Sequence, residues 1–233
     1  MPFYKKISIN NATSVFIWKI EEDYDELYSS ILLKKTSIAR LQSMKDVRHQ
    51  NGFLSIRHLL KIAGYDDFDL YYDEKGKPHL RLNNGIETSV NLLNASPNEK
   101  HISISHSFKF SAIIISDEKV GIDIELRRDK VQLIAKKFID EEFNFLDTFS
   151  PDYSSLLTVI WGAKESIYKL YNQKGLFFIE NIEVFPFSIE DKEGTARVTF
   201  KNEKSNYYFT FEEIESYTLV YVVENSPNLL IHA

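Results

Sequence analysis

Acidic residues at alternating positions mark the segment Val120–Glu125 as a candidate cation site. Its sequence is Val-Gly-Ile-Asp-Ile-Glu, so Asp123 and Glu125 point to one side of a strand and the apolar residues to the other. Two carboxylates on one face suit a hard cation such as Mg²⁺, with phosphate oxygens completing its shell. A half-buried antiparallel strand with one wet face has the same pattern. The pattern alone therefore leaves both interpretations open.

A second group of charged residues recurs at helical spacing between Trp161 and Lys169. Trp161, Glu165 and Lys169 stand four apart and share one helix face, with Lys164 beside them. One interpretation is a solvated face with a Glu165–Lys169 ion pair, which contributes only tenths of a kcal/mol. The other is that Glu165 supplies a third metal oxygen and the lysines hold phosphate.

Two further segments carry groups that bind anions. Ser105-His106-Ser107 follows a short apolar strand and offers N–H and hydroxyl donors, although a buried structural histidine is the usual explanation. Lys75-Gly76-Lys77-Pro78 lets a backbone approach a ligand beside a point charge, although such a sequence is usually only a turn. Arg48 is one of several basic residues on a predicted helix. No Gly-x-Ser-x-Gly elbow surrounds His106, which argues against a hydrolase triad.

Composition narrows the classes of protein. The 233 residues are enough for one large domain or two small ones, and 43% hydrophobic with 27% charged residues indicates a globular protein. The net charge of -6 disfavours nucleic acid as a partner. The absence of cysteine excludes disulfides, thiolate catalysis and cysteine-ligated zinc. No signal peptide and no membrane span are expected, so the predicted location is the cytoplasm.

The elements that must position these groups form two rounds of strands and helices. The expected strands cover 15–18, 68–72, 101–105, 111–116, 120–125, 180–187, 196–201, 207–212 and 217–223. The expected helices cover 21–33, 38–62, 131–138, 140–146 and 156–171. Loops are expected at 83–85 and 94–98, and the tail after Asn225 carries little signal. The repeated order predicts two similar α+β halves, 1–117 and 118–233, the second carrying the metal site.

The ordered combination of motifs is more specific than any one of them. Gly-Lys-Pro is followed by Ile-Ser-His-Ser, then Gly-Ile-Asp-Ile-Glu, then Trp-x-x-Lys-Glu-Ser-x-x-Lys. This order and spacing resemble the 4′-phosphopantetheinyl transferase superfamily, in particular its long, surfactin-synthetase-activating (Sfp) type, over roughly Lys45 to Gly175. The resemblance implies transfer of the phosphopantetheine arm of coenzyme A to a serine of an acyl or peptidyl carrier protein, releasing adenosine 3′,5′-bisphosphate. It also implies a pseudo-dimer of two α+β halves, so a monomer is expected.

The resemblance assigns roles to individual residues. It implies metal ligation, with Mg²⁺ as the expected cofactor, by Asp123, Glu125 and Glu165. It implies contacts with coenzyme A by Arg48, Lys77, Pro78, Ser105, His106, Lys164 and Lys169. Lys35 is a candidate contact for the 3′-phosphate by its offset from Arg48. A further acid is expected at Glu141-Glu142, where Glu142 is favoured.

The chemistry of the reaction fits these roles. Mg²⁺ would neutralise charge that grows on the leaving bisphosphate, assisted by Lys169 and His106. The carrier serine needs a base, for which Glu142 and Glu165 are both candidates, so the expected catalytic residues are Glu165, Glu142 and Lys169. One alternative is a Mg²⁺-dependent hydrolase of a nucleotide-like diphosphate. Another is a binding module for coenzyme A or a carrier, although retention of the acids and Lys169 argues against it.

The region after Lys169 resembles the part that family members use to hold the carrier. Because the protein is acidic overall, docking is expected to rely on apolar contacts from 176–178 beside Lys174. Core packing at the start of a strand is the competing interpretation of these apolar residues. The sequence leaves the physiological carrier open.

Overall fold

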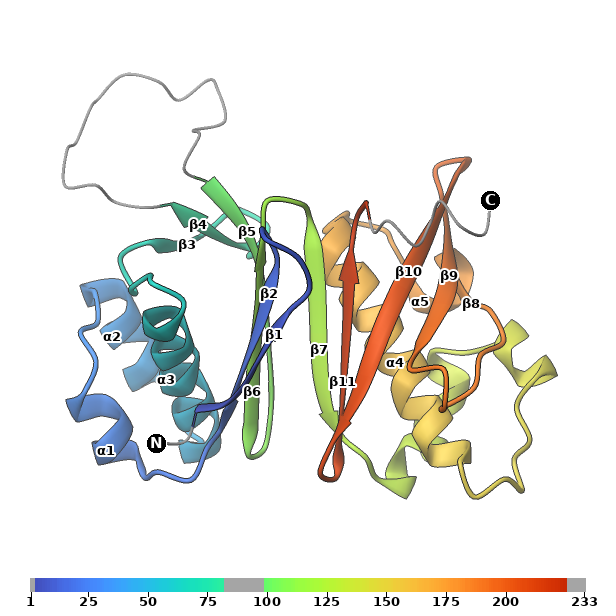
Figure 1. Cartoon of the computed structure of the whole chain (residues 1–233), viewed down its shortest axis with the longest axis horizontal. Coiled ribbons are helices and arrows are strands. Elements are labelled where there is room, and N and C mark those ends of the chain that lie inside the picture. Colours follow the sequence, from blue (N-terminus) through green and yellow to red (C-terminus); the bar gives the residue numbers. More distant parts are fainter. Residues whose placement is uncertain (1–2, 82–98, 226–233) are drawn as a thin grey trace. The chain divides into compact units, whose positions relative to one another are not determined.

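A computed structural model describes residues 3–81 and 99–225 of the chain (Figure 1). The chain divides into two compact units, Met1–Asp117 and Glu118–Ala233. Each unit has its own antiparallel sheet and its own helices. The α+β class predicted from the sequence is therefore confirmed.

The first unit places three helices against a six-stranded sheet. Its elements are β1 (Phe3–Ser8), β2 (Ser14–Lys19), α1 (Tyr24–Ser29), α2 (Lys35–Ser43), α3 (Val47–Ile62), β3 (Leu70–Tyr72), β4 (Pro78–Arg81), β5 (Glu99–Ser107) and β6 (Phe110–Ser116). The strand order is β1-β2-β6-β5-β4-β3. Helix α3 packs against β2, β5 and β6, and its buried apolar residues form the core of this unit with those strands.

The single long helix expected at 38–62 is wrong, because the chain forms two helices there. Helix α2 ends at Ser43 and α3 begins at Val47. Asp46 is the N-cap of α3, and its side chain accepts a hydrogen bond from the Arg48 backbone N–H at 2.9 Å. An aspartate cap satisfies a donor that has no partner inside the helix, so it favours a new helix start at this position.

The second unit is a five-stranded sheet packed against one long helix. Its elements are β7 (Val120–Leu126), the 3-10 helices η1 (Asp129–Lys137) and η2 (Glu141–Asn144), α4 (Tyr153–Tyr171), α5 (Phe178–Asn181), β8 (Ile182–Val184), β9 (Glu193–Phe200), β10 (Glu203–Ile214) and β11 (Tyr217–Val223). The strand order is β7-β11-β10-β9-β8. Helix α4 packs against β7, β11, β10 and β8, while η1 lies against α4 and η2 against β8.

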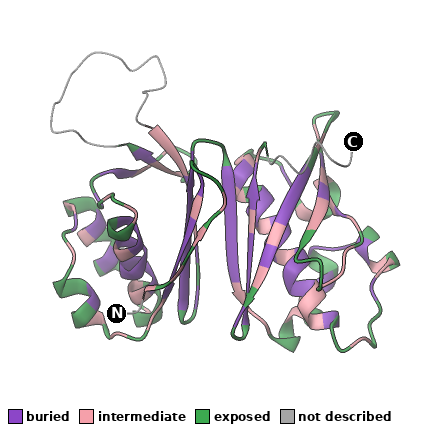
Figure 2. Ribbon diagram, in the orientation of Figure 1, coloured by how far each residue is buried: buried purple, intermediate pink, exposed green. Residues whose placement is uncertain are grey.

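Strand β7 is buried on both faces for most of its length, which differs from the half-wet strand that its alternation suggested. Residues 120–124 are buried and the strand becomes more exposed only from Glu125 (Figure 2). Helix α4 covers β7, so Asp123 faces protein instead of water. A buried carboxylate needs a compensating charge or hydrogen bonds from the groups around it.

Other differences concern short elements. Strands β1 and β4 were not expected, and the strand expected at 180–187 begins with the one-turn helix α5. Strand β1 alternates between intermediate and exposed residues at one end of the sheet order, so its sequence carries little apolar signal. The loops expected at 83–85 and 94–98, and the tail after Asn225, lie outside the described residues. None of the helices in the described ranges combines the length and apolar character that a membrane crossing requires.

Candidate active site

Asp123 on β7 and Lys169 on α4 form the centre of the candidate site. The Lys169 Nζ donates to Asp123 Oδ1 at 2.8 Å and to the backbone oxygen of Ile122 at 2.9 Å. The Asp123 side chain is 6% exposed and that of Lys169 is 27% exposed. The pair is therefore sheltered on its acidic side and reaches solvent on its basic side, where an anionic group can approach Lys169.

Two glycines let α4 approach the sheet closely enough to make this pair. A methyl group on Gly121 would lie 1.8 Å from the backbone oxygen of Ser166, and one on Gly162 would lie 2.5 Å from Val220 Cγ2. Ser166 Oγ also donates to the Val220 backbone oxygen at 3.0 Å. The backbone of Gly121 therefore lies directly against α4.

Gly121→Ala is expected to lower the free energy of unfolding by about 3 kcal/mol, the upper part of the range for overpacking. The new methyl overlaps a backbone oxygen, which cannot rotate away, so Ser166→Ala should give no rescue. Gly162→Ala overlaps only the Val220 side chain, so Val220→Ala should couple favourably with it by about 1 kcal/mol. Urea denaturation of the single and double variants measures both couplings, and rescue of Gly121→Ala by Ser166→Ala would contradict the backbone explanation.

Glu165 lies close enough to Asp123 and Glu125 for their negative charges to affect its pKa. The pKa of the Glu165 carboxyl is raised chiefly because burial disfavours its charged form, while Lys169 opposes the rise and the negative charges of Asp123 and Glu125 add to it. Lys169 thus interacts with both Asp123 and Glu165. The repulsion that Asp123 and Glu125 exert on Glu165 is the kind of charge imbalance that a divalent cation relieves.

The three acids supply the hard oxygen donors that Mg²⁺ prefers, so the donor chemistry fits that ion. Within residues 3–81 and 99–225, however, no three histidine or acidic side chains stand close enough to form a ready-made metal cluster. Glu125 and Glu165 are partly exposed. Long glutamate side chains in that setting can change rotamer to reach a common ion, which is consistent with a site completed by substrate oxygens.

Trp161 belongs to the hydrophobic packing, although it was grouped with Glu165 and Lys169 by its spacing. Its ring makes edge-to-face contacts with Phe138 at 5.1 Å and with Phe178 at 5.6 Å between centroids. The chemistry of this helix face is therefore carried by Glu165 and Lys169.

Glu142 and Lys164 form a buried ion pair. Lys164 Nζ lies 2.7 Å from Glu142 Oε1, and the two side chains are 1% and 2% exposed. Glu142 also accepts from the backbone N–H groups of Asp140 and Val184, and Lys164 donates to the backbone oxygen of Phe178. Burial lowers the pKa of Lys164, and the charge of Glu142 opposes that change. The structure thus engages both groups with protein, where the sequence had placed them against substrate.

In the first unit, the start of α3 meets the end of β5. The His106 ring lies 6.1 Å from that of His49, and a methyl group on Gly52 would lie 3.0 Å from His106 Nδ1. The Arg48 guanidinium lies 5.9 Å from the Phe108 ring centroid. His106 is exposed, in contrast to the usual buried structural histidine. Basic and aromatic groups thus gather around the first turn of α3, which suits an anionic ligand.

The remaining residues predicted to contact coenzyme A occupy other parts of this unit. Ser105 is buried in β5. Lys77 lies in the turn between β3 and β4, where its backbone N–H donates to Asp73 Oδ1 at 2.9 Å, and Pro78 pairs with Tyr72. Lys35 is the first residue of α2. Asp46 and His49 were not predicted as neighbours of Arg48 and His106, although the aspartate cap was a readable signal.

Arg48 is held by Asp46 in a two-point contact. Arg48 Nη2 lies 2.6 Å from Asp46 Oδ2, and Nε lies 3.1 Å from Oδ1. The side-chain hydrogen bond from Arg48, with its backbone N–H, lowers the pKa of Asp46 from 3.8 to about 2. Because the pKa of Asp46 is lower in the folded state, its ionised carboxylate stabilises the fold above pH 3.8. This contribution is lost as the pH falls toward 2.

Arg48→Gln is expected to raise the pKa of Asp46 from about 2 toward 3.8, without fully reaching it because the backbone hydrogen bond remains. NMR titration of the aspartate carboxyl carbons measures this shift. Arg40→Gln, on the preceding helix, is the matched control and should leave the Asp46 titration unchanged. An unaltered pKa in Arg48→Gln would show that the two side chains do not interact in solution.

The second unit therefore pairs a buried strand acid, Asp123, with a lysine and a glutamate of the helix that covers it. Residues 119–222 match the family model of the 4′-phosphopantetheinyl transferase superfamily. The matched residues include Asp123, Glu165 and Lys169. No curated protein matches the chain.

Proposed function

We propose that the protein transfers the 4′-phosphopantetheine arm of coenzyme A to a serine of an apo acyl or peptidyl carrier protein, releasing adenosine 3′,5′-bisphosphate. The superfamily domain supports phosphopantetheine transfer in general, with coenzyme A and a carrier protein as partners. The observation that carries the proposal is the contact of Lys169 with Asp123 beside Glu165, within the segment that matches the family. We place the chain in the long Sfp-type class, because a second sheet-bearing unit precedes that segment.

In this proposal the chain's own residues orient the pyrophosphate and move one proton. The carrier serine oxygen attacks the phosphorus that bears the pantetheine arm, and the bond from that phosphorus to the bridging oxygen breaks. Lys169, oriented by Asp123 and the Ile122 backbone oxygen, binds the phosphate oxygens on which charge develops. The basic cluster at Arg48 and His106 binds the phosphates of the nucleotide.

Asp123, Glu125 and Glu165 would hold Mg²⁺. When bound, the ion supplies neutralisation of the negative charge on the pyrophosphate and the leaving group. Asp123 orients Lys169 and would also supply one oxygen to Mg²⁺. It would therefore hold both positive charges that the proposed reaction uses, the lysine ammonium and the metal ion. Because the chain itself contains two α+β units, we expect the protein to work as a monomer. We expect it to be located in the cytoplasm.

Glu165 is the better placed of the two candidate bases for the serine proton. It is partly exposed, and it could take the serine proton with an oxygen that does not bind Mg²⁺. Glu142 is 2% exposed and its oxygens accept hydrogen bonds from Lys164, Asp140 and Val184. To act as the base, Glu142 would first have to leave these partners and reach solvent.

The apolar segment after α4 is the proposed contact with the carrier. Leu176 is buried and Phe178 packs on the core, so these two have the structural role that was the competing interpretation. Phe177 is 59% exposed, Ile179 is 38% exposed, and Lys174 is exposed beside them. An exposed aromatic next to a lysine suits an acidic helical partner.

Mass spectrometry of the carrier tests the proposed function. Incubation of the protein with coenzyme A, Mg²⁺ and a panel of apo acyl and peptidyl carriers should increase the carrier mass by one phosphopantetheine arm, and a chelator should abolish the gain. Consumption of coenzyme A without any mass gain would favour the hydrolase alternative. An unchanged rate in the presence of chelator would exclude the role proposed for Mg²⁺.

A further inference from the structure

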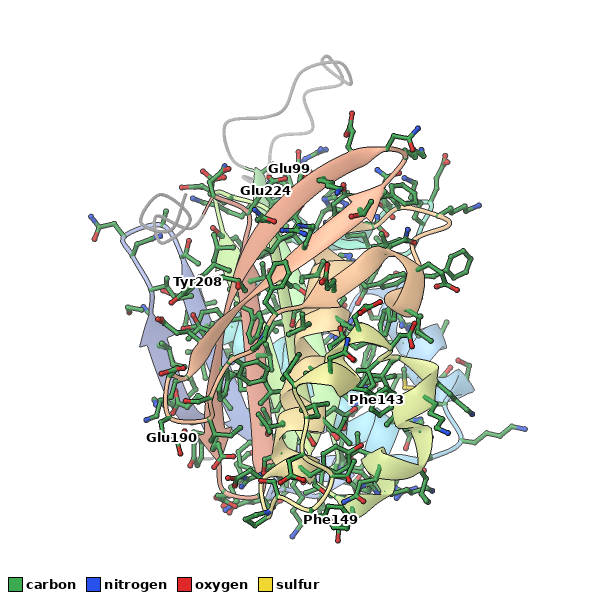
Figure 3. The ribbon with its side chains drawn as sticks, turned by 90° about the vertical axis from the view of Figure 1, so that its right-hand side faces the viewer. Glu99, Phe143, Phe149, Glu190, Tyr208 and Glu224 are labelled. Atoms are coloured by element: carbon green, nitrogen blue, oxygen red, sulfur yellow. The ribbon has the colours of Figure 1, made fainter. Side chains whose placement is uncertain are left out.

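The buried pair Glu142–Lys164 connects four elements of the second unit. Glu142 belongs to η2, whose neighbouring residue Phe143 is labelled in Figure 3, and Lys164 belongs to α4. The Lys164 Nζ donates to the Phe178 backbone oxygen at 3.2 Å. Glu142 Oε1 accepts from the Val184 backbone N–H at 3.0 Å. The two charged groups thus hold both ends of the segment that comprises α5 and β8.

This segment needs external anchors because it has little structure of its own. Helix α5 spans four residues, about one turn, which is too short to be stable in isolation. The Asn181 side chain accepts from the Phe177 N–H at 2.7 Å and donates to the Thr199 backbone oxygen at 2.9 Å. The Phe178 ring packs on Trp161 and Tyr168, both residues of α4. Contacts from α4, η2 and β9 therefore hold the conformation of the segment.

The outer side of the same turn is apolar and exposed. Phe177 and Ile179 flank Phe178 and are turned outward, with exposed fractions of 59% and 38%. The charged pair lies on the inner side, where it is almost completely buried. A well-packed apolar pair could fill the same volume without loss of stability, so the charges are not needed merely to fill the core. Unlike an apolar pair, Glu142 and Lys164 make hydrogen bonds to defined backbone atoms. These bonds fix the positions of Phe178 and Val184.

We propose that Glu142 and Lys164 are positioning residues, which hold the 177–184 segment in the conformation that binds the carrier protein and take no part in the chemical step. This inference rests on the proposed function. Under this proposal the buried pair affects how tightly the carrier binds, and Asp123, Glu165 and Lys169 act in the chemical step. Replacement of the pair should therefore raise the KM for the carrier and leave the KM for coenzyme A unchanged.

The test uses the double variant Glu142→Leu/Lys164→Met, which replaces the charges by apolar side chains of similar size. If the binding conformation then forms only a tenth of the time, the carrier KM rises about tenfold while kcat changes by less than about threefold. Amide hydrogen exchange at Phe177 and Asn181 should be faster by about tenfold, although the substitutions do not touch their own acceptors.

Two variants serve as controls. Lys119→Met/Glu224→Leu removes an ion pair of the same 2.7 Å length from the same unit, but one that is partly exposed, and should change neither the carrier KM nor the exchange. Phe177→Ser should raise the carrier KM without accelerating exchange at Asn181. If the apolar double variant does not fold, Glu142→Gln/Lys164→Gln, which keeps hydrogen-bonding groups of similar length, is measured in the same way.

Two results would overturn the proposal. A kcat reduced by about a hundredfold or more with an unchanged carrier KM would make Glu142 or Lys164 part of the chemistry. Unchanged carrier KM and unchanged exchange in a folded variant would show that the segment keeps its conformation without the pair. If the wild-type protein modifies no carrier, the proposed function fails, whereas the exchange measurement still tests the positioning.

Discussion

Asp123→Asn is expected to reduce kcat/KM for phosphopantetheine transfer by at least about a hundredfold, comparable to removal of an important electrostatic group from an active site. The substitution weakens the contact that orients Lys169 Nζ, which is 2.8 Å from Asp123 Oδ1, and removes one of the proposed metal oxygens. Both losses affect the groups that would stabilise charge on the leaving bisphosphate. Initial rates with coenzyme A and an apo carrier measure the effect.

Stability and charge must be controlled in this experiment. A thermal melt should show that the Asp123→Asn protein remains folded. Asp129→Asn removes the same charge from η1, where the side chain accepts a hydrogen bond from Ser154, and should retain nearly the full rate. The Mg²⁺ concentration for half-maximal rate should rise in Asp123→Asn and stay constant in Asp129→Asn. Undiminished transfer by Asp123→Asn would exclude Asp123 from the site.

Lys164→Met is expected to lower the free energy of unfolding by about 3–5 kcal/mol, because it leaves the buried carboxylate of Glu142 without its counter-charge. This loss is a large fraction of the stability of an ordinary domain. Adding Glu142→Leu to the same protein should recover most of it, since the apolar pair has no charge to bury. Urea denaturation of the two single variants and the double variant measures the coupling.

The exposed pair Lys119–Glu224 again supplies the comparison. Lys119→Met should cost less than about 1 kcal/mol, because water screens that ion pair. Equal losses in Lys119→Met and Lys164→Met would show that Lys164 is not buried with its charge in solution. A double variant less stable than either single variant would show that the site cannot be filled by apolar side chains.

Local pattern in the sequence was sufficient to find the strand that carries Asp123 and the helix that carries Lys169. The alternation in 120–125 and the four-residue spacing of Glu165 and Lys169 are both local, and β7 and α4 lie where these patterns indicate. One of the two interpretations of that alternation was a strand with a wet face, whereas residues 120–124 of β7 are buried. That α4 covers this face depends on packing between elements that are more than forty residues apart in the chain, as in the contact of Asp123 with Lys169.

The buried pair illustrates what a single sequence does not reveal. The resemblance to the superfamily implied a base at Glu142 and a coenzyme A contact at Lys164, although acids and lysines are mostly exposed and the two are buried together here. Backbone groups of α5 and β8 bind this pair, and α5 was not predicted at all. Strand β1 was missed for a related reason, since it gains its order by pairing with β2 and has little apolar pattern of its own. The aspartate cap at Asp46, in contrast, was present in the sequence as a helix-start signal.

The side-by-side placement of Lys164 and Glu165 on α4 has a practical consequence for protein engineering. Successive helical residues are turned by about 100°, so Lys164 faces the segment proposed to bind the carrier and Glu165 faces the proposed site of chemistry. A one-residue insertion or deletion in this turn of α4 would disrupt both at once. Attempts to change carrier choice by transplanting 174–184 from a relative should therefore keep the length of α4 and move the acceptor at position 142 together with the graft.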